Sequence, residues 1–416
     1  MNTNCPSQAM QNSFYTALGA MSAFTELFQE PQNLTNYLNQ VQQTPDQLLQ
    51  DLAAKGKNME EDMANFVKAH CCGCKKPSSY PQYVEQADGQ AFNQPYEIKG
   101  TTMYGFAIEA SMSKLQDVCD KYLNNPSNGE LEYRPVMSHV ILTINNLDSL
   151  RSINPPDYEK GTVQEQEVVF WMLTVVGKKV GPVFVAERLA WFIPYIYVNN
   201  ATPLVSGREV YGFFKQFGTV QMPKIDQPPD LFTLDTLVFK EFTPETKAIE
   251  ARLLEVRRIS QEGKHPAIKT WGNFEEAISA IANLLFEKNN EITVPGLGLP
   301  FNLLDYLVKK IVPLVNLKQF RDAEDSRRAC YQALIESPMQ LQTFHGGKLL
   351  GFDDFGDKFE LTINKFASQP IVQDLGLHTG YSPGSESIQI PIKLAFLLNF
   401  DFSFQNGTAV WQAPQK

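Results

Sequence analysis

Lys215 is the side chain in this sequence whose surroundings are most suited to covalent chemistry. It follows an apolar, glycine-containing segment, residues 203–214, and three aromatic residues lie close to it: Phe213, Phe214 and Phe217. An ammonium group among aromatic side chains has little help in keeping its charge, so desolvation favours the neutral amine. A neutral lysine can attack a carbonyl carbon and form a Schiff base. The segment therefore predicts a nucleophilic lysine.

A second interpretation of Lys215 is structural. Lysine often lays its methylene groups along apolar side chains and extends its ammonium group into water. A lysine at the end of a strand can do this without being reactive. The aromatic neighbours by themselves leave both interpretations open.

The residues before Lys215 resemble the signature of the acetoacetate decarboxylase superfamily. The signature is Gly207-Arg208-Glu209, five further residues and then the lysine, and it follows the apolar run of residues 192–200. In that family the lysine forms a Schiff base with a β-keto acid, and it is activated by desolvation or by a neighbouring cation. The resemblance implies the same nucleophilic role for Lys215.

Other segments are similar to the family in order and spacing. They are residues 131–135 with 146–151, residues 163–172, and residues 314–320 with 329–334. The similarity thus extends over roughly residues 95–240 and 312–405. Only the lysine motif is specific, and the other segments support it by their order.

The resemblance also implies two catalytic partners for the lysine. Arg134 stands where the family carries an arginine that faces the substrate carboxylate, and a guanidinium fork suits that task. Glu187 resembles the second of two glutamates that line the family's site, and we expect it to move protons. The first glutamate would fall near Phe170 or Trp171, where this chain has no acid.

Two acids lie slightly upstream of the missing glutamate. Glu165 and Glu167 share one face of a strand by alternation, so either could turn inward. Solvation of both carboxylates is the expectation here. Arg134 has a similar alternative, as an ordinary surface arginine before Pro135.

Further residues are expected to shape the site. Four side chains are expected to contact the substrate: Trp171, Phe170, Phe213 and Tyr197. Three residues are expected to support the turn that aims the lysine: Gly207, Arg208 and Glu209. The family commonly has a second lysine after the reactive one, whereas this chain has Gln216, so burial alone must favour the neutral amine.

The elements that position these residues begin with a helical region. Residues 1–78 carry apolar side chains at helical spacing, and Thr44-Pro45-Asp46-Gln47 is a helix-start signal. From about residue 95, short β-rich runs separated by Pro, Asn and Gly predict a barrel or sandwich with one helix, residues 111–123. The last apolar run, residues 394–402, is typical of either a strand or a short helix.

An inserted block interrupts the β-rich region at about residues 244–312. Its helical periodicity predicts helices over residues 248–260 and 274–287, with a third candidate at 301–311. We therefore expect an α+β protein, an acetoacetate decarboxylase-like antiparallel β-barrel over residues 95–416 with an N-terminal helical region and this insertion.

Composition and charge limit the class of protein. The chain of 416 residues is 43% hydrophobic and contains 28 Phe, which is ample material for a core. The net charge of −10 argues against binding of nucleic acid or of an anionic membrane. No apolar run approaches the ~20 residues that a membrane-spanning helix needs.

Six cysteines, unevenly placed, do not form a disulfide framework in a chain of this size. The cluster of residues 70–74 has no second group of ligands, so we expect free thiols and no zinc. Residues 1–14 lack the features of a secretory signal, and a cytoplasmic location is expected.

The sequence thus favours a Schiff-base lyase acting on a β-keto acid or related carbonyl compound, with decarboxylation preferred. No cofactor or metal is expected, and a homo-oligomer is implied by the resemblance. Three alternatives stay open. They are an aldolase or dehydratase of the same family, a barrel that binds a small molecule without turnover, and an interaction protein whose helical blocks form the surface.

Overall fold

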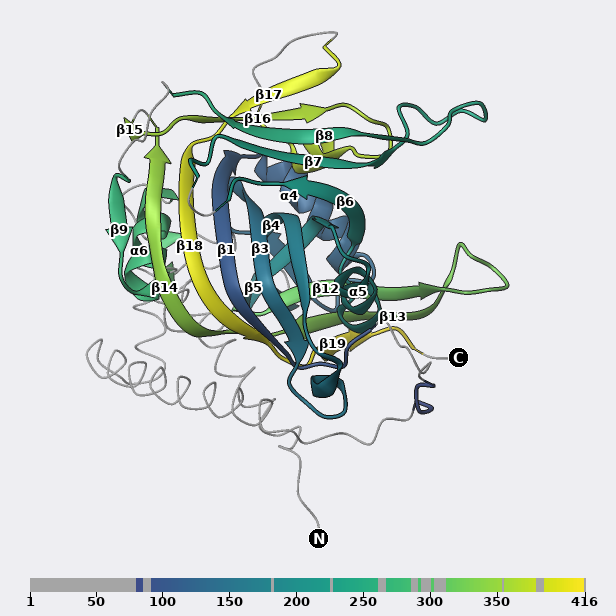
Figure 1. Cartoon of the computed structure of the whole chain (residues 1–416). Coiled ribbons are helices and arrows are strands. Elements are labelled where there is room, and N and C mark those ends of the chain that lie inside the picture. Colours follow the sequence, from purple (N-terminus) through teal and green to yellow (C-terminus); the bar gives the residue numbers. More distant parts are fainter. Residues whose placement is uncertain are drawn as a thin grey trace, which may run out of the picture. The chain divides into compact units, whose positions relative to one another are not determined.

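Long strands form the centre of the structure, a computed structural model of the chain. β1 (Tyr96–Glu109) pairs antiparallel with β3 (His139–Ser152) on one side and with β18 (Leu394–Phe404) on the other. β3 continues to β4 (Val163–Val180), and β18 continues to β14 (Met339–Phe352). These five strands lie side by side in the order β14, β18, β1, β3, β4 (Figure 1).

β5 (Val183–Val198) connects further strands through two parallel ladders. It pairs with β6 (Lys215–Gln221) and with β12 (Leu314–Arg321). β12 forms an antiparallel hairpin with β13 (Ala329–Ser337), which also pairs with β19 (Thr408–Gln412). Residues 314–320 and 329–334, which resemble the family in order and spacing, therefore belong to one hairpin.

β6 also begins a series of antiparallel strands. β6 pairs with β7 (Leu231–Val238), and β7 pairs with β8 (Ile249–Arg258). β8 then pairs with β16 (Phe359–Asn364), which pairs with β17 (Ser387–Pro391). Lys215 thus stands where a parallel ladder meets an antiparallel one.

The remaining elements of the described residues are short. Five are strands of two to four residues: β2 (Glu132–Pro135), β9 (Lys269–Trp271), β10 (Glu291–Ile292), β11 (Phe301–Asn302) and β15 (Phe355–Gly356). Four are α-helices: α4 (Met112–Cys119), α5 (Ala201–Ser206), α6 (Phe274–Leu285) and α8 (Ile371–Leu375). Three are π or 3₁₀ turns: Asp120–Asn124, Asp157–Lys160 and Gly207–Tyr211.

The structure describes ten stretches of the chain: residues 80–84, 91–180, 183–224, 227–260, 267–285, 291–292, 301–302, 312–353, 355–378 and 385–414. Two compact units are present, one of residues 1–88, 179–186 and 293–300, the other of residues 89–178, 187–292 and 301–416. The elements of the lysine site belong to the second unit. The predicted helical region 1–78 lies outside the described residues, and the predicted domain division stays a prediction.

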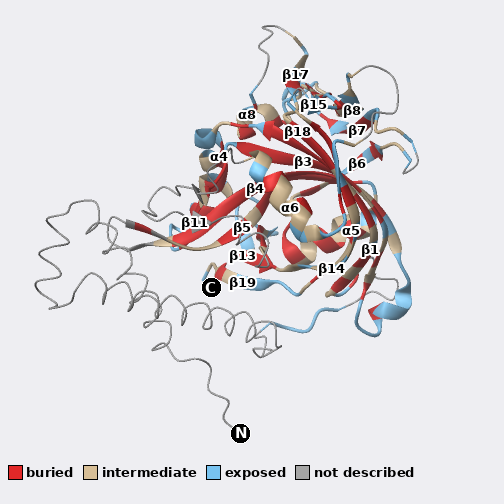
Figure 2. Ribbon diagram, turned by 90° about the vertical axis from the view of Figure 1, so that its left-hand side faces the viewer, coloured by how far each residue is buried: buried red, intermediate tan, exposed pale blue. Residues whose placement is uncertain are grey.

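Side-chain alternation gives the central strands two buried faces. One, the core face, carries Phe106, Leu142 and Phe170 in one row across β1, β3 and β4, and it belongs to the larger hydrophobic core. The opposite face is called the lysine face because Lys215 lies on it. It includes Leu147 and Val169, which pack in a second apolar cluster with residues of β5 and β18. Buried residues concentrate in these strands (Figure 2).

The predicted helix 111–123 is confirmed and covers part of the core. α4 and the π turn after it bury one side of their surface, including Leu115, Val118 and Leu123. Their apolar residues recur three to five positions apart, which is the spacing of a helix that packs on one side. This helix therefore packs against the core face of the sheet rather than near Lys215.

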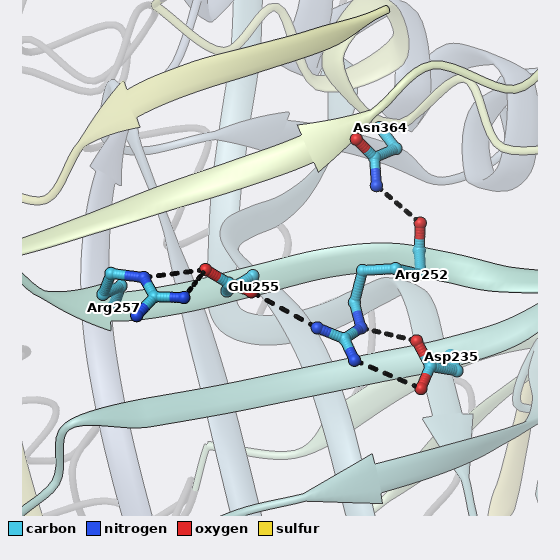
Figure 3. Close-up of polar contacts among 5 residues, drawn as sticks. All are labelled: Asp235, Arg252, Glu255, Arg257 and Asn364. Atoms are coloured by element: carbon cyan, nitrogen blue, oxygen red, sulfur yellow. Dashed lines mark hydrogen bonds and ion pairs between the residues drawn. The ribbon is translucent and has the colours of Figure 1, made fainter.

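An ion-pair network lies on the outer side of β7 and β8. Arg252 donates to Asp235 across the two strands and to Glu255 along β8, and Arg257 also donates to Glu255 (Figure 3). The Asn364 amide of β16 donates to the Arg252 carbonyl oxygen at 2.7 Å. The network links three neighbouring strands, and its charges are partly solvated.

Residues 248–260 do not form the predicted helix. They form β8, in which Leu254 and Val256 are buried while Glu255 and Arg257 are not. Apolar residues in this segment fit both a helical stripe and a strand with one buried face, so periodicity could not decide. Pairing with β7 on one side and β16 on the other decides in favour of the strand.

The other helix predictions of the insertion have different outcomes. Residues 274–285 are helical, as α6. Of the third candidate, Phe301–Asn302 is a short strand, and residues 303–311 lie outside the described part. Residues 394–402 belong to β18, which is a strand because β1 and β14 flank it on both sides.

The α+β class and the mainly antiparallel sheet are confirmed. Within the described residues, the ladders do not close into a complete barrel. Among those residues, no helix is long and apolar enough to span a membrane.

Candidate active site

The local structure around Lys215 explains how the motif residues fix the lysine. α5 leads into the π turn Gly207–Tyr211, and Gly212 then takes a positive φ of 83°, which is the left-handed region that glycine adopts without strain. Lys215 begins β6 three residues later and pairs with Ile196 of β5. Since paired residues share a face, the Lys215 side chain lies on the lysine face with Ile196.

The Lys215 ammonium group is buried and forms an ion pair. Its Nζ lies 2.8 Å from Oε1 of Glu165, and the two side chains are 9% and 2% exposed. Glu165 therefore turns inward, contrary to the expectation that it is solvated. The surroundings of Lys215 are also less apolar than predicted, because they include a carboxylate.

Glu167 lies next to Glu165 on the same face of β4 and is half-buried. It accepts a hydrogen bond of 2.8 Å from the Asn145 amide of β3. Burial raises the pKa of Glu167 to about 7, and the charge of Glu165 adds to this rise, while Lys215 opposes it. Near neutral pH, Glu167 can therefore both donate and accept a proton, whereas Glu165 is held in an ion pair.

A chain of hydrogen bonds fixes Glu167 from β3. The Asn145 amide nitrogen also donates to Thr143 Oγ1 at 3.1 Å, and the Trp171 indole nitrogen donates to the same oxygen at 2.9 Å. Asn145 and Thr143 are almost fully buried. The orientation of Glu167 is thus set by groups that have little freedom to move.

Gly207 provides space for the lysine side chain. A Cβ atom at this position would lie 2.7 Å from Lys215 Cδ and 2.9 Å from its Cε. Arg208 acts on the backbone instead, because its Nη1 donates to the Lys215 carbonyl oxygen at 2.9 Å. These two contacts agree with the supporting roles that the sequence predicted for the motif.

Glu209 belongs to a separate pair of residues. Its charge acts on Lys318 of β12, whose backbone packs directly against Gly212. Burial lowers the pKa of Lys318, and the Glu209 carboxylate opposes this effect. Lys318 also lies 5.7 Å from the Phe320 ring centroid and 5.6 Å from that of Tyr331, so it is a second lysine with aromatic neighbours.

The predicted partners Arg134 and Glu187 are not brought to Lys215. Arg134 pairs with Val175, which is ten residues beyond Glu165, or roughly 33 Å along β4. Its guanidinium group is bound to Glu132 at 2.6 Å. Arg134 thus lies in β2, far along β4 from the residues that surround Lys215.

Glu187 lies near the other end of β5. It is nine residues, or roughly 30 Å of strand, from Ile196, the residue that pairs with Lys215. Its carboxylate forms ion pairs with Lys178 at 3.7 Å and with Arg188 at 3.2 Å. The carboxylates that lie close to Lys215 are therefore those of Glu165 and Glu167.

The predicted substrate-contacting residues divide between the two faces. Trp171 and Phe213 lie on the lysine face, and Lys215 Nζ is 5.9 Å from the Phe213 ring centroid. Phe170 and Tyr197 point to the core face, where Tyr197 donates to Gln369 at 2.6 Å. Alternation explains the division, since Phe170 and Trp171 are consecutive in a strand and cannot share a face.

Asn145 and Thr143 were missed by sequence reasoning. Glu165 and Glu167 could be located by their alternation near the lysine motif. Asn145 meets Glu167 only through the β3–β4 register, which no short-range pattern encodes. The parts of the chain that the structure describes contain no group of three or more His, Cys, Asp or Glu side chains that could hold a metal ion.

Comparisons with known proteins found similarity in structure only. No protein-family model matches the chain, and no curated protein matches it. The structure is similar to acetoacetate decarboxylase from Legionella pneumophila, with a TM-score of 0.47 and 12% identity over 82% of this chain and 94% of that one. A second acetoacetate decarboxylase structure gives a TM-score of 0.46 and 13% identity over 80% and 96%.

The enduracididine biosynthesis enzyme MppR, complexed with pyruvate, is also similar. Its TM-score is 0.44, with 12% identity over 80% of this chain and 98% of MppR. Two of these three structures carry the name of the family that the lysine motif resembles. At 12–13% identity and TM-scores below 0.5, these similarities assign no activity and no residue role to this chain.

Proposed function

We propose that the protein is a lyase that forms a Schiff base between Lys215 and a carbonyl substrate. The observation that carries the proposal is the buried ion pair of Lys215 and Glu165, with Glu167 beside it at a pKa of about 7. A nucleophile with one carboxylate in an ion pair and a second whose pKa is about 7 has the groups that imine chemistry needs. Arg134 and Glu187 are left out because they lie near the far ends of β4 and β5.

The first step is addition of the amine to the substrate carbonyl. Glu165 accepts a proton from the Lys215 ammonium group, across their 2.8 Å hydrogen bond, and the neutral amine then attacks the carbonyl carbon. Protonated Glu167 donates to the hydroxyl group of the resulting carbinolamine, which leaves as water. The product is an iminium ion attached to Lys215.

The iminium ion then accepts an electron pair from a bond next to it. Cleavage of that carbon–carbon bond leaves an enamine on Lys215, and the enamine carbon later takes a proton from a carboxyl group. Water adds to the regenerated iminium and releases the amine and the carbonyl product. Every proton in this cycle can be passed between Lys215, Glu165 and Glu167.

Decarboxylation and aldol cleavage share this cycle and differ in the group that departs. The sequence favoured decarboxylation of a β-keto acid, which requires a cation for the substrate carboxylate. Arg134 was the predicted cation, and its distance along β4 weakens that preference. A homo-oligomeric state and a cytoplasmic location stay predictions from the sequence.

Reductive trapping tests the proposal. Incubation of the full chain with 2-butanone or acetoacetate and cyanoborohydride should attach one substrate skeleton to Lys215, located by peptide mass analysis. The added mass is that of the substrate less one oxygen atom, and less carbon dioxide as well where acetoacetate is decarboxylated before reduction. Lys215→Arg should remove this adduct while keeping a cation for Glu165. Lys318 is the matched control, because it is half-buried among aromatic rings but is influenced by one carboxylate, that of Glu209, and Lys318→Arg should leave the adduct unchanged. An adduct at Lys318 instead, or no adduct at all, contradicts the proposal.

Gly207→Ala should slow the trapping of Lys215 by about tenfold or more, since the new methyl group occupies the space of the lysine side chain. Gly207 has helical dihedral angles, φ −64° and ψ −41°, so alanine itself suits the backbone there. Gly272→Ala is the control, because a Cβ atom there has no heavy atom within 4 Å. Equal trapping rates for the two variants would show that Gly207 does not position the lysine.

A further inference from the structure

Two buried polar atoms on the lysine face have no hydrogen-bond partner among the described residues. They are Oδ1 of Asn145 and Oγ1 of Thr101. Asn145 is 1% exposed and Thr101 is 2% exposed, so both residues are almost completely shielded from solvent. Buried polar groups normally have a hydrogen-bond partner. Two such groups without a partner, on the face that carries Lys215, indicate a ligand that supplies the missing hydrogen bonds.

The strand register brings these atoms to the acids of the site. Asn145 pairs directly with Glu167 across β3 and β4. Thr101 of β1 pairs with Leu147, which in turn pairs with Glu165. Thr101 and Asn145 are therefore diagonal neighbours on one face, at the ~7–8 Å separation typical of such positions.

The Asn145 side chain has a defined orientation. Its Nδ2 donates both to the Glu167 carboxylate and to Thr143 Oγ1. Reversing the amide would direct a carbonyl oxygen at the Glu167 carboxylate, which is unfavourable whenever that group is ionised. The atom left without a partner is therefore the oxygen, which accepts hydrogen bonds and cannot donate them.

The charges of the site disfavour an anionic ligand. Two carboxylates, Glu165 and Glu167, lie side by side on β4. Among the described residues, Lys215 is the one cation within hydrogen-bond distance of either. At the iminium stage the nitrogen of Lys215 carries one positive charge, and a substrate carboxylate would compete for it with Glu165 and Glu167.

We infer that the substrate of this site is an uncharged carbonyl compound that carries hydroxyl groups, a hydroxy-ketone or hydroxy-aldehyde, rather than a keto acid. A substrate hydroxyl group donates to Asn145 Oδ1, and Thr101 Oγ1 bonds to the same or a second hydroxyl group. The inference rests on the proposed Schiff-base function and names the substrate class for it.

A hydroxyl group β to the carbonyl carbon also selects the reaction. A carboxylate of β4 removes the hydroxyl proton, the carbon–carbon bond breaks, and its electrons form the enamine on Lys215. The fragment that departs is an aldehyde or ketone instead of carbon dioxide. The enamine takes up a proton, and water releases the second carbonyl product, so the reaction is an aldol cleavage that needs no redox partner.

Competitive labelling of the full chain tests the substrate class with three four-carbon probes. They are 4-hydroxy-2-butanone, 2-butanone and acetoacetate, each used with cyanoborohydride and each corrected for its rate with N-acetyl-lysine. The hydroxy-ketone should label Lys215 about tenfold faster than either of the other two, which is the effect expected of one or two added hydrogen bonds.

Thr101→Val provides the matched variant. Valine has the shape of threonine without the hydroxyl group, and the hydroxyl group it removes has no partner in the described part of the protein, so folding should be unaffected. The variant should lose about fivefold of the hydroxy-ketone labelling while 2-butanone labelling stays unchanged. Thr233→Val removes another buried, unpartnered hydroxyl group, in β7, and should change neither rate.

The outcomes separate the two claims. Faster labelling by the hydroxy-ketone, with its loss in Thr101→Val alone, supports the inference. Equal corrected rates for the hydroxy-ketone and 2-butanone, or a preference for acetoacetate, overturn the inference but leave the Schiff-base lyase intact. Absence of labelling by all three probes overturns the proposed function itself.

Discussion

Glu165→Gln is expected to lower the free energy of unfolding by about 3 kcal/mol at pH 7, the low end of the range for breaking a buried ion pair. The glutamine cannot neutralise the Lys215 ammonium group, which is 9% exposed and 2.8 Å from the present carboxylate. Glu167 lies close enough to compensate in part, which places the effect at the lower limit. Urea unfolding followed by tryptophan fluorescence measures this change.

A double variant separates the charge from the packing. Glu165→Gln combined with Lys215→Met removes both members of the ion pair, so most of the lost stability should return. Glu386→Gln is the surface control, because the Lys240–Glu386 pair has the same 2.8 Å distance with side chains 67% and 83% exposed, and no measurable change is expected. A loss for Glu165→Gln as small as that of the surface control would refute a buried ion pair at Lys215.

The lysine and its supporting turn could be predicted from the sequence because the contacts of Gly207 and Arg208 with Lys215 are local. Gly207 and Arg208 contact Lys215 across seven or eight positions of one continuous segment. The Glu165 contact is different, since it joins residues 50 positions apart. The aromatic neighbours in sequence predicted an apolar environment, whereas the fold adds a carboxylate from another strand.

The position of a residue along its strand, relative to Lys215, was the second quantity that the sequence could not supply. Arg134 and Glu187 were assigned to segments that are indeed strands, β2 and β5. Their distance from Lys215 depends on which residue pairs with which, and a displacement of nine or ten residues moves a side chain by roughly 30 Å. The carboxylates that lie level with Lys215 are those of Glu165 and Glu167, which were expected to face solvent.

The face of the sheet to which a side chain points was more predictable than the position of the residue along its strand. Alternation placed Glu165 and Glu167 together, and the same rule separates Trp171 from Phe170. Applied to the substrate-contacting residues, alternation alone excludes one of these two neighbours from the lysine face. The strand β8 shows the limit of pattern reasoning, because its periodicity suits a helix equally well and only its pairing with β7 and β16 makes it a strand.

Glu167→Gln is expected to stabilise the protein at alkaline pH and to have little effect in acid. The pKa of Glu167 rises from its usual 4.5 to about 7 on folding, mainly through burial and secondarily through the charge of Glu165. Below pH 4.5 the carboxyl group is protonated in both the folded and the unfolded state, so its ionisation contributes nothing to stability.

Between pH 4.5 and 7 the folded state keeps a proton that the unfolded state has lost. Stability therefore falls as the pH rises through this window, and above pH 7 the full cost of about 3 kcal/mol is present. Glutamine carries no such cost and can still accept the hydrogen bond from Asn145 through its carbonyl oxygen. The variant should gain up to about 3 kcal/mol over the wild type at pH 8 relative to pH 4.5.

The measurement is the difference in unfolding free energy between Glu167→Gln and the wild type, taken at several pH values from 4.5 to 8. All other titrating groups are shared by the two proteins, so their contributions largely cancel in this difference. Glu165→Gln is the matched comparison, being the same substitution two residues away on the same face with the opposite expected sign at pH 7. A pH-independent difference for Glu167→Gln would mean that Glu167 ionises normally, and Glu167 would then be fully ionised at neutral pH and unable to donate the proton that the carbinolamine requires.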